Sequence, residues 1–103
     1  MWAQLIKMRL KPGSSTDELT KEIRAAEQPG SGLVRSLFMH DQSEPAAVYT
    51  LVMFENEEQA RAREQDTRRQ EHLQKARSIM AEIFDGPPEF TDLIVVDEWT
   101  GEG

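Results

Sequence analysis

A run of apolar residues in the middle of the chain constrains the fold more than any other feature. From Ala46 to Glu55 the sequence reads AAVYTLVMFE, and residues 48 to 54 are almost all β-branched, aromatic or aliphatic. A strand of this composition is typical of the centre of a sheet, where both faces are covered. The rest of the chain supplies helices for only one face. We therefore expect the other face to be covered from outside this chain.

Length and composition predict one small domain. The chain has 103 residues, of which 38% are hydrophobic and 30% charged, as expected for a soluble globular protein. No apolar run approaches the ~18 residues that a membrane-spanning helix needs. The first residues, MWAQLIKMRLKPG, lack the basic segment of a signal peptide, so we expect a cytoplasmic protein without a membrane partner. The absence of cysteine excludes disulfides, thiolate metal sites and cysteine nucleophiles.

The charge pattern argues against a nucleic-acid partner. The net charge is −7, whereas proteins that bind nucleic acid need a basic face. Half of the twelve basic residues nevertheless fall in one segment, and nothing after it is basic: Arg61, Arg63, Arg68, Arg69, Lys75 and Arg77. This segment is either a solvated helix face or a mouth that attracts anions.

The first third of the chain predicts a strand followed by a helix. From Trp2 to Leu10 polar and apolar residues alternate, which is typical of a strand with one apolar face. Ser15 stands three residues before Glu18, in the spacing of a capping box, so a helix is expected from about Thr16 to Gln28. Its apolar stripe is thin and comprises Leu19, Ile23 and Ala26.

The middle of the chain predicts an antiparallel hairpin. A second strand is expected from Leu33 to His40, and residues 41–45 form a short connection to the apolar strand. The register of this hairpin stays open, because a shift of one residue moves every side chain to the opposite face. The sequence therefore leaves undecided which of four side chains share a face: Phe38, His40, Tyr49 and Leu51.

The last part of the chain predicts two helical segments and a strand. Asn56 is a good N-cap for a helix. The stretch from Arg63 to His72 has no apolar side chain, so we expect it to be irregular or exposed. A packed helix should follow and end at Asp85–Pro88, before a final strand from Phe90 to Trp99.

This order of elements, βαββαβ, is that of the ferredoxin-like α+β fold. It predicts an antiparallel four-stranded sheet over residues 1–100, with the first and third strands central, helices on one face, and a short tail at residues 101–103. The uncovered face should carry large apolar side chains, so we expect a two-fold homodimer that packs sheet against sheet. The alternative is a monomer that tolerates an apolar face.

Two segments carry a resemblance to a known family. Residues 52–60, VMFENEEQA, run from strand into helix, and residues 80–88, MAEIFDGPP, precede the last strand. In this pattern and in length the chain resembles the dimeric α/β-barrel superfamily, and more narrowly its antibiotic-biosynthesis-monooxygenase-like domains. The resemblance implies a dimer with a pocket between sheet and helices in each subunit. Some members oxygenate phenolic polyketides or quinols without metal or flavin, others degrade haem, and many have no known activity.

The haem-degrading relatives differ from this chain at their functional positions. They have an asparagine on the first strand, a tryptophan on the second helix and a histidine ligand further along. The approximate equivalents here are Ile6, Arg63 and Leu73, with His72 one position away. We therefore expect neither haem degradation nor another cofactor. A metal site is not expected either, because the two histidines stand 32 positions apart with no carboxylate at ligand spacing.

Oxygenation without a cofactor needs an apolar chamber and a group that removes or stabilises a proton. His72 is the candidate acid or base, and the alternative is a solvated histidine on a charged helix. His40, at a strand end, is interpreted as an edge residue. The candidate substrate-binding residues are Phe38, Tyr49, Arg63 and Met80, for each of which an ordinary core or surface role is the alternative.

Two functions therefore remain open after the sequence alone. The first is a cofactor-independent monooxygenase that acts on an aromatic or quinol-type small molecule. The second is a non-catalytic dimeric domain that binds a small molecule or serves in assembly. A closed chamber lined by Phe38, Tyr49 and Met80 with His72 or Arg63 reaching into it would favour the first.

Overall fold

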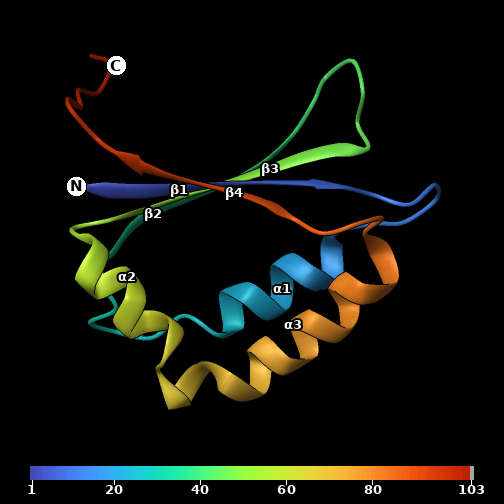
Figure 1. Ribbon diagram of the computed structural model, residues 1–103, viewed down its shortest axis with the longest axis horizontal. Coiled ribbons are helices and arrows are strands. Elements are labelled where there is room, and N and C mark those ends of the chain that lie inside the picture. The colour runs from blue at the N-terminus through green and yellow to red at the C-terminus, as the bar shows by residue number, and fades with distance from the viewer. Residues whose placement is uncertain (103) are drawn as a thin grey trace.

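The computed structural model describes residues 1–102, so the predicted tail at 101–103 lies partly outside the described residues. Four strands and three helices follow the predicted order (Figure 1). The elements are β1 (Trp2–Arg9), α1 (Asp17–Ala25), β2 (Leu33–His40), β3 (Ala47–Phe54), α2 (Glu57–Glu64), the short 3₁₀ turn η1 (Thr67–Arg69), α3 (Gln70–Ile83) and β4 (Glu89–Ile94). Within residues 1–102, no helix is both long enough and apolar enough to cross a bilayer.

The four strands form one sheet in the order β2-β3-β1-β4, and every neighbouring pair is antiparallel. The prediction that the first and third strands occupy the centre is confirmed. All helices cover the same face of the sheet, and the other face is open (Figure 1). The α+β, ferredoxin-like architecture predicted from the order of elements is therefore confirmed.

The strand register decides which side chains share a face. Met8 lies opposite Val48, and both are buried on the helix side. Phe38 pairs with Thr50, which is two positions after Val48 in β3 and therefore on the same face. Phe38 thus lies on the helix side as well. Tyr49 belongs to the open face. The other large apolar side chains of the open face are half-buried or exposed, and they are Leu5, Leu37, Met39, Leu51, Met53 and Leu93.

The main apolar core lies between the sheet and the α1–α3 pair. Its buried residues are Met8, Leu19, Val48, Ala76 and Phe84. Leu19 and Val48 are fully buried, and the partly buried Met80 and Ile79 pack against the cluster. A smaller cluster of Trp2, Phe54 and Ala60 lies under α2. Most of the buried apolar surface is therefore at the α1–α3 end of the helical layer.

The two predictions for helix starts had different outcomes. The capping box at the start of α1 was a wrong prediction: Ser15 Oγ accepts the Asp17 N–H at 3.2 Å rather than the Glu18 N–H, and the N-cap residue, Thr16, makes no side-chain cap. The N-cap of α2 is confirmed, because Asn56 Oδ1 accepts the Gln59 N–H at 2.8 Å. In this chain the type of the cap residue predicted side-chain capping better than the three-residue spacing of a capping box did.

The predicted polar break between two helices is confirmed, since α2 ends at Glu64 and α3 begins at Gln70. The segment is not all exposed, however, because Arg69 is only 4% exposed. Its Nη1 donates to the Arg63 carbonyl oxygen at 3.0 Å, which gives part of the buried guanidinium a partner. The sequence gave no indication that Arg69 would be buried, because it has no apolar neighbours in the chain.

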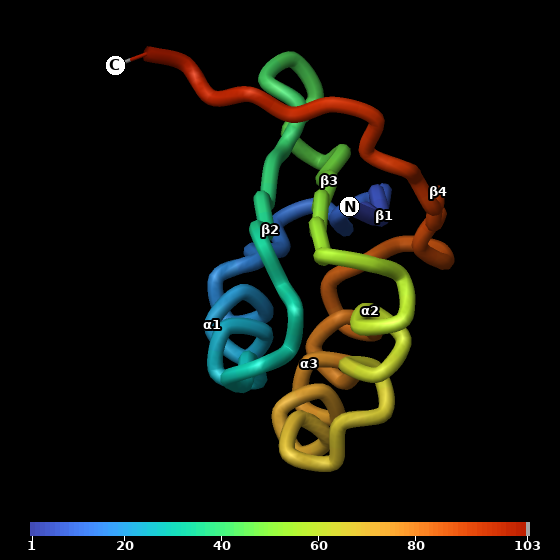
Figure 2. The backbone as a smooth tube through the Cα atoms, turned by 90° about the vertical axis from the view of Figure 1, so that its left-hand side faces the viewer, coloured from blue at the N-terminus to red at the C-terminus, as the bar shows by residue number. Residues whose placement is uncertain are grey.

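The last strand is shorter than the predicted Phe90–Trp99 and ends at Ile94. Ile94 pairs with Trp2, the first residue of β1, and the Val95 N–H reaches the Met1 carbonyl, so β1 offers no further partner. The following residues leave the sheet on the side opposite the helices (Figures 1 and 2). They carry Trp99, which is 82% exposed.

Candidate functional site

A cleft of about 650 Å³ lies between one face of α1 and strands β2 and β3. Its residues on and after α1 recur at intervals of three and four positions, which places them on one side of the helix. The full lining is Asp17, Thr20, Lys21, Ile23, Arg24, Glu27, Leu33, Ser36, Phe38, Thr50 and Arg63. This volume is within the usual range of small-molecule sites.

The walls of the cleft combine apolar surface with hydroxyl groups. Ile23 contributes from α1, and Leu33 and Phe38 contribute from β2. Ser36 and Thr50 also line the cleft, from neighbouring strands. Such a surface can pack on an aromatic ring and donate hydrogen bonds to its substituents.

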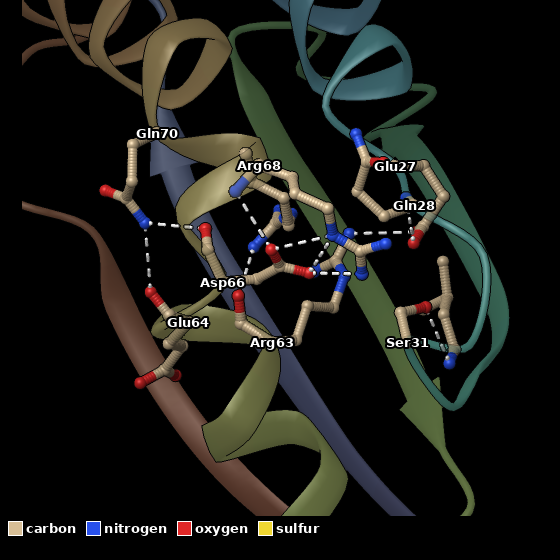
Figure 3. Close-up of polar contacts among 10 residues, drawn as sticks. Glu27, Gln28, Ser31, Arg63, Glu64, Asp66, Arg68 and Gln70 are labelled. Carbon is tan, nitrogen blue, oxygen red and sulfur yellow. Dashed lines mark hydrogen bonds and ion pairs between the residues drawn. The ribbon is translucent and has the colours of Figure 1, made fainter.

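One end of the cleft is formed by Arg63, which extends from α2 toward the residues after α1 (Figure 3). Its Nη2 lies 3.1 Å from Glu27 Oε2, and its guanidinium carbon lies 5.4 Å from the centre of the Phe54 ring. The side chain is only 14% exposed. The aromatic contact and the ion pair together hold this guanidinium in place.

Glu27 is the carboxylate that balances Arg63. Burial acts to raise the pKa of Glu27, but hydrogen bonds from Ser31 and the Gln28 N–H, together with the Arg63 charge, outweigh it. The pKa of Glu27 is therefore below its ordinary value, and Glu27 is an anion at neutral pH.

Arg69 is a second buried cation, and its guanidinium donates to the Arg63 carbonyl oxygen. Burial and the neighbouring Arg63 charge lower the pKa of Arg69 from its usual value. The Nε atoms of both arginines are buried and have no hydrogen-bond acceptor within residues 1–102. The nearby carboxylate of Asp66 is bound by Arg68, with Oδ2 and Nη2 2.7 Å apart, and this hydrogen bond holds the pKa of Asp66 at about 2 (Figure 3).

The structure brings together two of the predicted substrate-binding residues and separates the others. Phe38 and Arg63 both line the cleft. Tyr49 lies on the open face, 5.9 Å from Lys7 Nζ, so it does not share a chamber with Phe38. Met80 packs against the main core. A chamber lined by Phe38, Tyr49 and Met80 together is therefore not formed within this chain.

His72, the predicted acid or base, lies outside the lining of the cleft. Its Nδ1 is 2.9 Å from Glu22 Oε2, so it links α3 to α1. This hydrogen bond from His72 lowers the pKa of Glu22. Helix α1 lines the cleft with Thr20, Ile23 and Arg24 but not with Glu22. Glu22 therefore projects from a different side of the helix.

His40 lines a hollow of its own beside the cleft, although the sequence gave it only an edge role. It lines a second hollow of about 250 Å³ together with Ser14, Ser15 and Phe38. Phe38 also lines the main cleft, so this residue borders both spaces. The sequence could have indicated this only if the hairpin register had been known. Glu27 was missed for a different reason, since no motif marks it.

The charged groups near the cleft are not arranged as a metal site. Within residues 1–102, no three histidine, cysteine, aspartate or glutamate side chains lie close enough together to hold a metal ion. The cleft lining carries three cations, Lys21, Arg24 and Arg63, and two carboxylates, Asp17 and Glu27. These groups are suited to an organic ion rather than to a metal.

Solved structures resemble this chain over nearly all of its length. A candidate antibiotic biosynthesis monooxygenase from Chloroflexus aurantiacus matches with a TM-score of 0.70 and 20% identity over 97% of this chain and 98% of that one. Rv0793 from Mycobacterium tuberculosis gives 0.73 and 13%, over 96% and 98%. SnoaB from Streptomyces nogalater, a cofactor-independent oxygenase solved as a point mutant, gives 0.68 and 10%, over 94% and 94%. The chain therefore shares its fold with these proteins.

At 10% to 20% identity these similarities concern the fold. No protein-family model matches the sequence, and no curated protein matches it either. The shared fold therefore accounts for the architecture of the chain, while its chemistry has to be argued from the cleft.

Proposed function

We propose that the protein binds an aromatic or quinol-type small molecule in the cleft between α1, β2 and β3 and oxygenates it with O₂, without metal or flavin. The observation that carries this proposal is the cleft itself: about 650 Å³, with Phe38 and Ile23 among its walls and Arg63 at one end. The oxygenase description of SnoaB, which shares the fold, supports the reaction type.

The proposed reaction needs little from the protein. A methylene group between two aromatic rings, made acidic by a conjugated carbonyl, loses a proton and forms a stabilised anion. The anion reacts with O₂: one oxygen atom becomes the new carbonyl oxygen, and the other leaves as water with the two methylene hydrogens. The substrate supplies all four electrons. The protein contributes a chamber and groups that stabilise the anion.

Residues of the cleft fit these roles. Phe38 and Ile23 would pack on the rings, and the hydroxyl groups of Ser36 and Thr50 would donate to oxygen substituents. Arg63, with low exposure, would stabilise negative charge more strongly than a solvated arginine would. His72 would act as acid or base only if the ligand reached the α1–α3 boundary.

We further propose that the functional unit is a homodimer in which the open sheet faces pack together. The open face carries Leu37, Leu51 and Leu5 in one row across three strands. The segment after β4, with exposed Trp99, lies on the same side of the sheet and would add to this interface (Figures 1 and 2). Light scattering at micromolar concentration should give the mass of two chains. A mass of one chain would contradict the dimer.

The alternative is a non-catalytic domain that binds the same class of small molecule. It is favoured by one observation: the lining of the cleft within residues 1–102 includes no histidine, and one of its two carboxylates, Glu27, is paired with Arg63. Both functions predict ligand binding, and only the first predicts consumption of O₂.

The test is a thermal-shift screen against anthrones, naphthoquinols and flavonoids, followed by O₂-uptake measurements on every compound that binds. A ligand at ~100 times its Kd should add about 2.7 kcal/mol to the stability. Ser36→Trp should fill the cleft and abolish the shift, whereas Ser78→Trp on the exposed side of α3 should keep it. Binding without O₂ uptake would favour the non-catalytic alternative. No binding by any compound would contradict both functions.

A further inference from the structure

We propose that the Arg63 end of the cleft is a carboxylate subsite, in which the carboxylate of an aromatic acid replaces Glu27 as the partner of Arg63. This inference rests on the proposed function, because it requires that an aromatic ligand occupies the cleft. It adds the chemical class of that ligand, an aromatic acid.

The first argument is the charge balance at this end of the cleft. Two guanidinium groups, Arg63 and Arg69, are largely buried here, and Glu27 is the carboxylate that pairs with Arg63. The other acidic groups nearby are paired elsewhere: Asp66 is bound by Arg68, and Glu64, which is 56% exposed, lies 3.3 Å from Arg61, a cation that also contacts Glu57 and Asp92. The buried part of the site therefore holds more positive than negative charge, in a protein whose net charge is −7.

The second argument is the unused hydrogen-bonding capacity of the two arginines. An arginine can donate five hydrogens and binds a carboxylate best through two parallel bonds. Arg63 uses Nη2 for Glu27, and its Nε has no acceptor within residues 1–102. Arg69 uses Nη1 for the Arg63 carbonyl, and its Nε also lacks an acceptor there. Buried donors without partners are costly. Arg63 lines the cleft and Arg69 does not, so a planar oxyanion in the cleft would engage Arg63, and Arg69 would add its nearby positive charge.

The third argument is that the two side chains of the ion pair are held by different contacts. Arg63 lies over the Phe54 ring and is 14% exposed, so its position is fixed by packing. The Glu27 side chain is 32% exposed and follows the end of α1 rather than lying within it. Because Glu27 Oε1 accepts the N–H of the adjacent Gln28 at 3.0 Å, a ligand carboxylate has to replace only the contact between Glu27 Oε2 and Arg63. In this arrangement Glu27 is an internal competitor of the ligand.

The entrance of the cleft is compatible with an anionic ligand. Lys21 and Arg24 are exposed and belong to its lining. Exposed cations at the mouth of a site raise the local concentration of anions, and this effect weakens with added salt. The apolar residues Phe38 and Ile23 would then receive the ring while the carboxylate reaches Arg63.

The test compares two compounds of the same shape and different charge, 1-naphthoate and naphthalene-1-carboxamide, by calorimetric titration at pH 7.5. The wild-type protein should bind 1-naphthoate at least about tenfold more tightly than the amide. Arg63→Gln should remove this preference while the affinity for the amide stays within about twofold. Glu27→Gln should have the opposite effect and strengthen only the binding of 1-naphthoate, by about threefold or more. Opposite effects of two variants of one ion pair cannot both come from misfolding.

The matched control is Arg77→Gln, which removes one positive charge from an exposed position on α3 outside the cleft lining. It should leave both affinities unchanged. Equal binding of the two compounds by the wild-type protein, or a preference that survives in Arg63→Gln, would overturn the carboxylate subsite and leave aromatic binding in the cleft intact. A Glu27→Gln variant that binds 1-naphthoate no more tightly would also overturn it. If neither compound binds, the subsite fails, and the screen against anthrones, naphthoquinols and flavonoids decides separately whether the proposed function fails as well.

Discussion

The two ends of the helical layer are built from different interactions. At one end α1 and α3 pack against the sheet through apolar side chains such as Leu19, Val48 and Phe84. At the other end α2 and η1 bury little apolar surface, with Ala60 the buried residue of α2. There a small apolar cluster, Trp2 and Phe54 with Ala60, is combined with ionic contacts, and Arg63 and Arg69 lie inside the protein.

This difference indicates a division of roles. Apolar burial stabilises a fold by roughly 25 cal/mol per Å², whereas burial of an ion pair costs desolvation that its attraction only partly offsets. The α1–α3 end is therefore expected to determine the stability of the protein. The α2 end is expected to contribute less to stability, and we propose that its charged groups serve ligand recognition. The following predictions test this division, beginning with the largest effect.

The largest effect is expected for Leu19→Ala in the main core. Leu19 is fully buried, so the truncation should lower the free energy of unfolding by about 3 kcal/mol, measured by urea denaturation. The affinity for 1-naphthoate should change by less than about twofold, because Leu19 does not line the cleft. Ile23→Ala, one turn later on the same helix, is the matched comparison. It should cost about 1 kcal/mol and weaken ligand binding, since Ile23 is 37% exposed and lines the cleft. Similar effects of both variants on binding would contradict the division.

The next effect concerns the turn between Glu27 and β2. Gly32 has φ of +78°, and a Cβ there would collide with the side chain of Gln59 on α2. Gly32→Ala should therefore cost about 2 kcal/mol or more in urea denaturation. Gly30→Ala has nearly the same φ, +77°, but open space around the position, so strain alone should cost about 1 kcal/mol. In a Gln59→Gly background, which removes the three nearest atoms including the Cβ at 2.8 Å, the two alanine variants should become equal. A persistent difference would contradict the collision.

A smaller effect is expected at the N-cap of α2. Asn56→Ala removes the acceptor of the Gln59 N–H and should cost about 1 kcal/mol by urea denaturation. Thr16→Ala at the start of α1 should cost only about a few tenths, because the Thr16 side chain makes no capping bond. Equal losses would show that the two helix starts do not differ in the way the structure describes.

The smallest effect is a dependence on pH at the α1–α3 boundary. The hydrogen bond from His72 lowers the pKa of Glu22 from its ordinary 4.5. The folded state therefore favours the carboxylate, so this contribution is present above about pH 4.5 and is lost as pH falls through the lowered pKa. Glu22→Gln should flatten the acid side of the stability curve, and Glu18→Gln, an exposed position on α1, should not. A parallel curve for Glu22→Gln would contradict the pair. His72→Ala should leave ligand affinity unchanged.

The fold was largely predictable from the sequence because period-two alternation and turn residues are local signals. The alternation from Trp2 to Leu10 identified β1 and the face it buries, and Asn56 marked the start of α2. The end of β4 was not predictable in the same way. Strand-forming residues after Ile94 stay outside the sheet because their partner strand, β1, begins at Trp2. The end of β4 is therefore set by the neighbouring strand and not by the residues of β4 itself.

The site was less predictable because it depends on register and on distant contacts. Phe38 and Arg63 were identified, but the register moved Tyr49 to the open face. The ion pair between Arg63 and Glu27 joins positions 36 apart in the sequence, and neither residue belongs to a motif. His72 was favoured because of its intrinsic pKa range, whereas its neighbours in space placed it against Glu22.

The most direct test of the central claim, that the cleft receives an aromatic small molecule, is a methyl NMR titration of the protein with 1-naphthoate. Ile23 lines the cleft, and Ile79 packs against the main core, so their methyl groups report on the two regions separately. The methyl signal of Ile23 should shift and saturate as the compound is added, while that of Ile79 stays in place. An unchanged Ile23 signal at a concentration of 1-naphthoate that saturates the protein would contradict the assignment of the cleft as the binding site.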